Sequence, residues 1–197
     1  MFEKDRFVED CRRAVRDGQK AVREVVLEAV GNPAGIISEL GEPSQAGVNT
    51  LYSGADATVI NFVWAPCMTL LPHNHNMFAV IGIYSGREDN LFWRRLPATA
   101  SNAGNGAGPG IEAAGADSMG TGQVATLGRD IIHSVANPIT KLTSALHVYG
   151  GDFFNPPVQR SQWDHESLTE QPWDMEYTRA VFHQAQTRYD AGLAAGV

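Results

Sequence analysis

From residue 49 onward the chain is a series of short apolar segments, each ended by Gly, Pro or polar residues. Residues 58–64 (TVINFVW) combine β-branched and aromatic side chains, which favours a strand. Similar short segments lie at residues 77–84, 91–93, 123–127, 131–135 and 142–149. Strands of this length and spacing are typical of a sandwich or a small barrel. The sequence therefore predicts a mainly β fold.

The two ends of the chain have a different periodicity. Apolar residues recur at helical spacing over the first thirty residues, Gly18 interrupts them, and Gly31-Asn32-Pro33 is a stop signal. Residues 174–189 predict one more helix. We expect a single domain over residues 1–197, because a chain of this length can form one sizeable core. Its parts are a helical segment (1–31), a β-barrel core (49–151) and a C-terminal extension (152–197) that packs on the barrel.

Composition limits the partners that the chain can have. The formal net charge is −7, and no dense basic run occurs, so nucleic acid and anionic membranes are not expected as partners. No apolar stretch reaches the roughly 20 residues that a membrane span needs, and the charged N-terminus is unlike a signal peptide. The two cysteines, Cys11 and Cys67, cannot make a disulfide framework. We expect a cytoplasmic protein that acts on a small molecule.

Three of the six histidines have the spacing of a metal site. His73 and His75 flank Asn74, and in an extended chain residues i and i+2 point to the same face. Such a pair also occurs by chance, but His133 lies on another predicted strand that can face it in a barrel. Three imidazoles on one face of an octahedron leave the opposite face open, as in facial-triad iron sites. We expect His73, His75 and His133 to bind one redox-active ion, Fe(II), with Ni, Mn, Cu or Zn as alternatives.

The second predicted group of site residues lies on the segment 142–149. Alternation places His147 and Tyr149 on one face, where Tyr149 can donate a hydrogen bond to substrate or dioxygen and His147 can position the phenol. The alternative is a buried pair with only a packing role.

Glu88 is the first carboxylate after His75. We interpret it as a solvated charge of the hairpin near Arg87.

Other polar residues have ordinary interpretations. We expect Arg94 and Arg95 to be solvated, with a substrate carboxylate as the alternative partner of one of them. His165 and His183 are expected at the surface or in packing. The Gly- and Ala-rich residues 98–122 predict a flexible loop, with a lid over a site as the alternative.

Taken in order, the motifs resemble those of the cysteine dioxygenase-like cupins, the thiol dioxygenases. The matching residues are His73-Asn74-His75, Gly128 through Asn137, and Leu146-His147-Val148-Tyr149, and the resemblance covers about residues 49–151. It implies a cupin double-stranded β-helix, a jelly-roll barrel, with N-terminal helices and a C-terminal extension. It also implies non-haem Fe(II) on the three histidines, with Tyr149 and His147 hydrogen-bonded beside the metal.

Three departures from the family pattern concern the substrate. Residues 76–81 lack the cysteine that mammalian-type members crosslink to the tyrosine, and Ala145 stands where the family has serine. No arginine lies around residues 51–54, where the family's carboxylate-binding arginine is found. We therefore expect a dioxygenase that uses O2 to oxidise a small thiol, other than free cysteine, to a sulfinate. The alternatives are a cupin oxygenase that cleaves a C–C bond of a diketone- or enolate-like molecule, and a non-catalytic metal-binding cupin.

Overall fold

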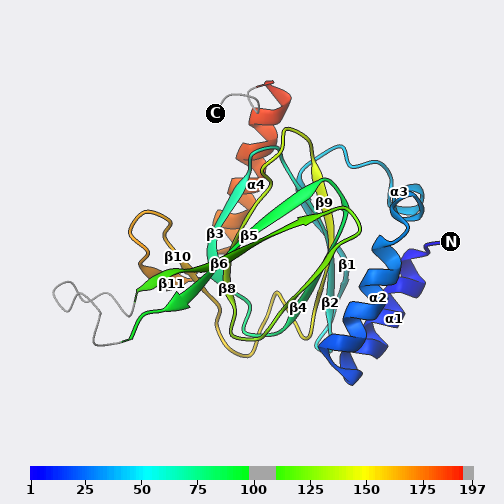
Figure 1. The fold of residues 1–197 in the computed structure, drawn as a ribbon, viewed down its shortest axis with the longest axis horizontal. Coiled ribbons are helices and arrows are strands. Elements are labelled where there is room, and N and C mark those ends of the chain that lie inside the picture. The colour runs from blue at the N-terminus through cyan, green and yellow to red at the C-terminus, as the bar shows by residue number, and fades with distance from the viewer. Residues whose placement is uncertain (98–109, 193–197) are drawn as a thin grey trace.

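A computed structural model describes residues 1–97 and 110–192 as two antiparallel β-sheets flanked by helices (Figure 1). The first sheet has the order β1 (Gly47–Ser53), β2 (Thr58–Trp64), β9 (Thr143–Tyr149), β4 (Ala79–Ser85) and β7 (Val124–Leu127). The second has the order β11 (Glu170–Pro172), β10 (Ser161–Trp163), β3 (Thr69–Asn74), β8 (Ile132–Ala136), β5 (Arg87–Arg95) and β6 (Ile111–Gly120). The helices are α1 (Lys4–Asp17), α2 (Gln19–Val30), α3 (Pro33–Leu40) and α4 (Met175–Asp190).

The strand pairing is that of one long hairpin wound into a barrel. β5 pairs with β6, β4 with β7, β3 with β8 and β2 with β9, all antiparallel. Successive pairs fall into alternate sheets, which is the double-stranded β-helix, or jelly roll, of cupins. This arrangement confirms the predicted fold class. Its centre is a core of buried side chains from the facing sides of both sheets.

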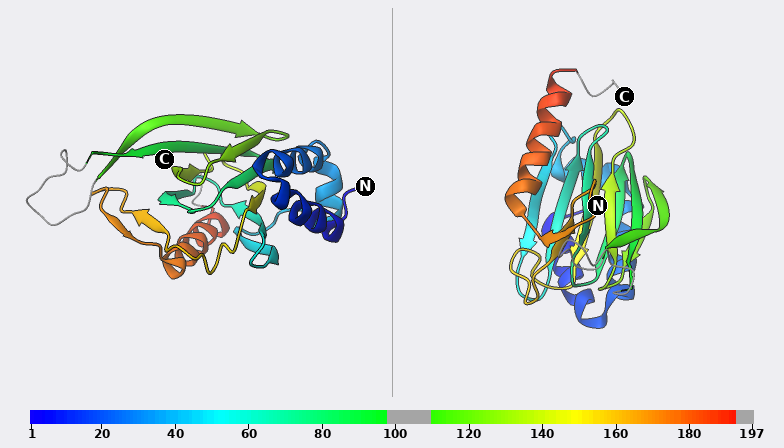
Figure 2. Two further views of the ribbon diagram at one scale, coloured as in Figure 1. Left: turned by 90° about the horizontal axis from the view of Figure 1, so that it is seen from below. Right: turned by 90° about the vertical axis from the view of Figure 1, so that its left-hand side faces the viewer.

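The N-terminal helices cover the outer face of the first sheet (Figure 2). Val22, Val26 and Val30 recur every four residues on α2 and are fully buried. Gly82 of β4 allows this close approach, because a Cβ there would lie 2.4 Å from Cγ1 of Val26. Gly18, with φ of +99°, separates α1 from α2 as the sequence predicts. The packing leaves the inner face of the sheet free to form the site.

The predicted stop after residue 30 also begins a helix that the sequence analysis missed. Asn32 caps α3 by accepting a hydrogen bond from the backbone N–H of Gly35, and Pro33 occupies the first helical position. Asn32 and Pro33 therefore start α3 directly after α2 ends. The Asn32 side chain accepts from a free backbone N–H, and the Pro33 ring fixes φ at a helical value.

The prediction of a loop over residues 98–122 is wrong for its second part. Residues 111–120 form β6, which pairs with β5 along its whole length. Small residues have a weak intrinsic preference for strands, and the long ladder with β5, which has one register shift between Phe92 and Trp93, overrides that preference. Residues 98–109, where a lid was the alternative, lie outside the described part of the chain.

The C-terminal extension closes one end of the barrel. Strand β10 pairs with β3 through Gln162 and His73, and Asp174 caps α4, because its carboxylate accepts from the N–H groups of Glu176 and Tyr177. Phe182 of α4 is buried against the barrel core. In residues 1–97 and 110–192, none of the helices has both the length and the apolar character that crossing a bilayer requires.

Candidate metal centre

The structure brings the three predicted ligand histidines together inside the barrel. The antiparallel register of β3 and β8 places His73 opposite His133, and His75 follows directly after β3. One ring nitrogen of each lies within 4.8 Å of the others, and Nε2 of His75 is 3.4 Å from Nε2 of His133. All three side chains are buried. Three nitrogen atoms at this separation can contact a single ion.

Burial keeps these imidazoles neutral. Removal from water lowers the pKa of His73 to about 3, with the positive charge of Arg160 as a further cause. The same desolvation, followed by the neighbouring histidines, lowers the pKa of His75 and of His133 well below the usual value. A neutral imidazole has one nitrogen with a free lone pair, which is the form that binds metals.

Hydrogen bonds determine which ring nitrogen of His73 and of His133 is free to bind a metal. Nδ1 of His73 lies 2.9 Å from the carbonyl oxygen of Leu71, which can only accept, so this nitrogen carries the proton. Nδ1 of His133 lies 2.6 Å from Oδ1 of Asn90. Both contacts leave Nε2 as the free lone pair, and for His133 that atom points at His75. Outer hydrogen bonds of this kind orient metal-bound histidines in proteins.

His147 and Tyr149 lie beside the cluster on β9. Nδ1 of His147 is 3.2 Å from the Tyr149 hydroxyl, and the Tyr149 ring meets the His75 ring edge-on at 5.0 Å between centroids. Both side chains are buried. Burial raises the pKa of Tyr149, so the phenol keeps its proton at neutral pH. The Tyr149 hydroxyl therefore lies where it can contact a molecule bound at the three histidines.

The prediction of a solvated Glu88 is wrong. Its side chain is fully buried, Oε1 accepts a hydrogen bond from Asn90 at 3.0 Å, and Oε2 lies 3.6 Å from Nε2 of His147. On β5 the neighbours Arg87 and Asp89 face outward and pair with each other. A strand sends alternate residues to opposite faces, so the position of Glu88 depends on the register of β5 and not on its nearness to the turn.

The cavity at the cluster is small and its walls are aromatic. It has a volume of about 20 Å³, which holds roughly one water-sized molecule. Besides the histidines and Tyr149, its lining includes Phe62, Trp64, Phe153 and Trp173. A larger hollow of about 550 Å³ lies next to it and shares Phe153, Trp173 and Met175. These three side chains therefore separate the cluster from the outer hollow.

Arg160 is the site residue that the sequence analysis missed. Its guanidinium group lies 4.0 Å from the ring centre of Phe153 and 4.2 Å from that of Trp173, and it donates to the backbone carbonyls of Asn74 and Phe153. Its Nη2 has no hydrogen-bond partner among the described residues. Burial lowers its pKa to about 10, so it remains charged at neutral pH. Nothing in the local sequence around Arg160 distinguishes it from a surface arginine.

The other predicted polar residues lie away from the cluster. Arg94 pairs with Glu112 and Arg95 with Glu170 on the second sheet. His165 is exposed in the turn after β10, and the exposed His183 lies on α4. None of these four groups lines the cavity at the cluster.

Comparisons with known proteins give only weak similarities. No protein-family model and no curated protein matches the chain. Among solved structures, a double-stranded β-helix protein from Klebsiella pneumoniae is 12% identical with a TM-score of 0.39, over 68% of this chain and 90% of that one. An RmlC-like cupin from Methanocaldococcus jannaschii is 12% identical with a TM-score of 0.41, over 56% and 84%. Hydroquinone 1,2-dioxygenase from Sphingomonas sp. TTNP3 is 9% identical with a TM-score of 0.41, over 57% and 71%.

Similarities of this size carry no argument about activity. The fold class rests on the strand pairing of the chain itself. Fold and site together describe a cupin-type barrel that encloses three neutral histidines and a Tyr–His pair, with a buried arginine against the aromatic wall of the cavity.

Proposed function

We propose that this protein is a non-haem Fe(II)-dependent dioxygenase that oxidises a small thiol to a sulfinate. The balanced reaction is R–SH + O2 → R–SO2H, in which sulfur is oxidised and dioxygen is reduced. The observation that carries the proposal is the buried cluster of three neutral histidines with the Tyr149 hydroxyl beside it. The resemblance of the sequence motifs to thiol dioxygenases supports the same reaction.

The donor set suits a divalent redox metal. His73, His75 and His133 would hold the ion through three uncharged nitrogen atoms, so its full positive charge favours an anionic partner such as a thiolate. Ferrous iron in this position would supply the redox chemistry that joins a thiol to dioxygen. Nickel, manganese, copper and zinc also accept imidazole ligands, and the choice of Fe(II) rests on the proposed reaction.

The residues around the cluster would prepare the reactants. The aromatic walls exclude water, which strengthens each polar interaction inside the cavity. The Tyr149 hydroxyl keeps its proton and would contact a bound ligand, while His147 holds the phenol in place. Fixing both reactants next to the cluster would remove much of the entropic barrier to their reaction.

Arg160 favours a thiol that carries an acidic group. Its charge is buried next to the cavity wall, and its Nη2 has hydrogen-bonding capacity that the described residues do not use. A buried guanidinium pairs strongly with a carboxylate. Arg160 also lines the larger outer hollow, so we propose as substrate a short thiol whose carboxylate reaches Arg160 and whose sulfur reaches the cluster.

The test combines metal analysis with dioxygen uptake. Protein loaded anaerobically with Fe(II) is mixed with short thiols that carry or lack a carboxylate, and oxygen consumption and product mass are measured. We expect uptake and a mass gain of two oxygen atoms, with preference for the acidic thiols. His133→Ala should lose the metal in elemental analysis, while the exposed His183→Ala should keep it.

Other results would lead to different conclusions. An iron-replete sample that consumes no oxygen with any thiol would refute the thiol reaction. If diketone- or enolate-like molecules then give products split at a C–C bond, with label from dioxygen, the protein is a carbon-cleaving oxygenase. Tight metal binding without oxygen consumption for any of these compounds would indicate a binding protein. A wild-type sample that binds no divalent metal would refute the metal centre itself.

A further inference from the structure

Glu88 is a fully buried carboxylate placed between the two histidine groups of the site. Oε1 faces the side chain of Asn90, and Oε2 faces the ring of His147. We propose that Glu88 is a positioning residue that sets which ring nitrogen carries the proton in both His133 and His147. The consequence for metal binding rests on the proposed metal centre, whereas the proton arrangement itself does not.

The first connection runs through Asn90 to His133. The amide nitrogen of Asn90 donates to the side-chain oxygen Oε1 of Glu88, at 3.0 Å. The amide oxygen then faces Nδ1 of His133, at 2.6 Å. That oxygen can only accept, so His133 must carry its proton on Nδ1. The lone pair is therefore on Nε2, the atom that points at His75.

The second connection runs through His147 to Tyr149. Oε2 of Glu88 and Nε2 of His147 lie 3.6 Å apart, both are buried, and neither has a hydrogen-bond partner among the described residues. A small shift would bring them to hydrogen-bond length, with the proton on Nε2. Nδ1 of His147 is then an acceptor for the Tyr149 hydroxyl, at 3.2 Å. The phenol oxygen would consequently present its lone pairs to the cavity.

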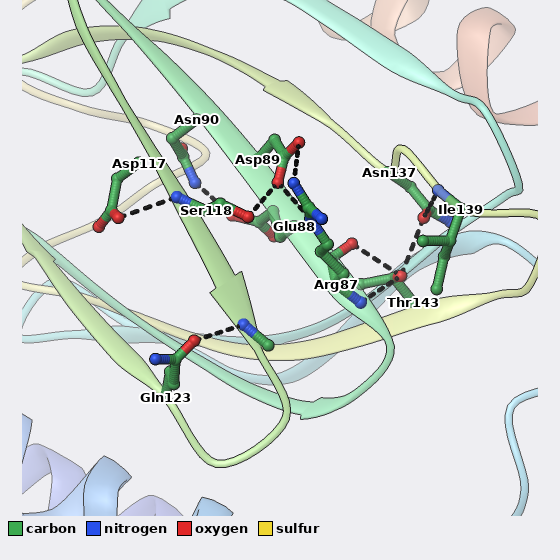
Figure 3. A network of polar contacts seen from close by, with 11 residues as sticks. Arg87, Glu88, Asp89, Asn90, Asp117, Ser118, Gln123, Asn137, Ile139 and Thr143 are labelled. Carbon is green, nitrogen blue, oxygen red and sulfur yellow. Dashed lines mark hydrogen bonds and ion pairs between the residues drawn. The ribbon is translucent and has the colours of Figure 1, made fainter.

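The strand geometry makes one residue serve both connections. Glu88 and Asn90 are two residues apart on β5 and share its inward face, while Asp89 pairs with Arg87 on the other face (Figure 3). In the facing sheet β9 carries His147, and β8, the neighbour of β5, carries His133. Glu88 therefore contacts groups from both sheets at the point where the site lies between them.

Replacement of Glu88 by glutamine separates the two connections. Glutamine has almost the same shape but offers one acceptor and one donor, so it cannot accept from Asn90 and from His147 at once. If Asn90 keeps its hydrogen bonds to residue 88 and to His133, the new NH2 group of the glutamine faces His147. Nε2 of His147 must then accept, and its proton moves to Nδ1. We expect His147 to change tautomer in Glu88→Gln and His133 to keep its own.

The experiment is nitrogen NMR of histidine-labelled, metal-free protein near neutral pH, since two-bond nitrogen–proton correlations identify the protonated ring nitrogen. Wild type should show His133 protonated on Nδ1 and His147 on Nε2. In Glu88→Gln the proton of His147 should move to Nδ1. A change of the His133 tautomer in place of the His147 tautomer would equally support control by Glu88. The matched control is Glu112→Gln, at a partly exposed glutamate on β6 that pairs with Arg94, which should leave both tautomers as in wild type.

Two results would overturn the proposal. One is wild-type His147 protonated on Nδ1 or His133 protonated on Nε2, and this measurement stands even if Glu88→Gln does not fold. The other is a folded Glu88→Gln with both tautomers unchanged.

A second variant links the arrangement to metal binding. Asn90→Leu removes the acceptor of His133 and should weaken Zn(II) binding, used as a spectroscopically silent probe, by about 10- to 100-fold in a competition titration. Unchanged affinity would refute the role of the Asn90 connection. If wild type binds no metal, the proposed function fails, and the NMR result still decides the role of Glu88.

Discussion

Acidification should destabilise the metal-free protein through its three buried histidines. The folded-state pKa of His73 is about 3, whereas an unfolded chain has a histidine pKa near 6.5. Between these values the unfolded state binds a proton that the folded state does not, so stability rises with pH. The stabilisation is complete above the unfolded pKa, and it decreases as the pH falls from about 6.5 toward 3.

The magnitude follows from these two values. At pH 5, protonation of the unfolded chain at His73 favours unfolding by about 2 kcal/mol relative to pH 8. His75 and His133 act in the same direction, because burial also lowers the pKa of each.

Urea unfolding at pH 8 and pH 5, with a chelator present, measures this effect. A change of about 2 kcal/mol shifts the urea midpoint by roughly 1 M, and the wild-type shift should be at least this large. His73→Gln should show a smaller pH-dependent shift, whereas the exposed His183→Gln should match wild type. Equal midpoints at the two pH values would refute the argument that the histidines are neutral because they are buried.

Three substitutions test other parts of the structure. Gly82→Ala should destabilise by about 1–3 kcal/mol in urea unfolding, because its Cβ would overlap Val26, whereas a Cβ at Gly120 would make only an ordinary contact, 3.7 Å from Oε1 of Gln123, and Gly120→Ala should have little effect. Asn137→Ala should cost about 3 kcal/mol, because its buried amide joins the ends of β2 and β9; a loss below about 1 kcal/mol would contradict this. Tyr149→Phe should lower the rate of dioxygen uptake by about 100-fold with metal content unchanged, and an unaltered rate would exclude the hydroxyl from the reaction.

Local signals predicted most of the secondary structure. β2 has the bounds 58–64 that its β-branched and aromatic residues indicate, and α4 starts and ends within one residue of the predicted helix. β6 was missed, because Gly and Ala carry no strand signal and its pairing with β5 is not a local property. Strands β10 and β11 were missed for a related reason, since each has only three residues.

The sequence by itself determined which side chains could form the site: two histidines spaced for one face of a strand, and a His-x-Tyr pair spaced for one face of another. Only the tertiary structure decided which distant residues join them. The register of β3 with β8 places His133 opposite His73, the register of β5 turns Glu88 inward, and the C-terminal extension brings Arg160 against the backbone carbonyl of Asn74. These contacts link residues far apart in the chain, and long-range strand pairing, which local residue preferences do not encode, determines them.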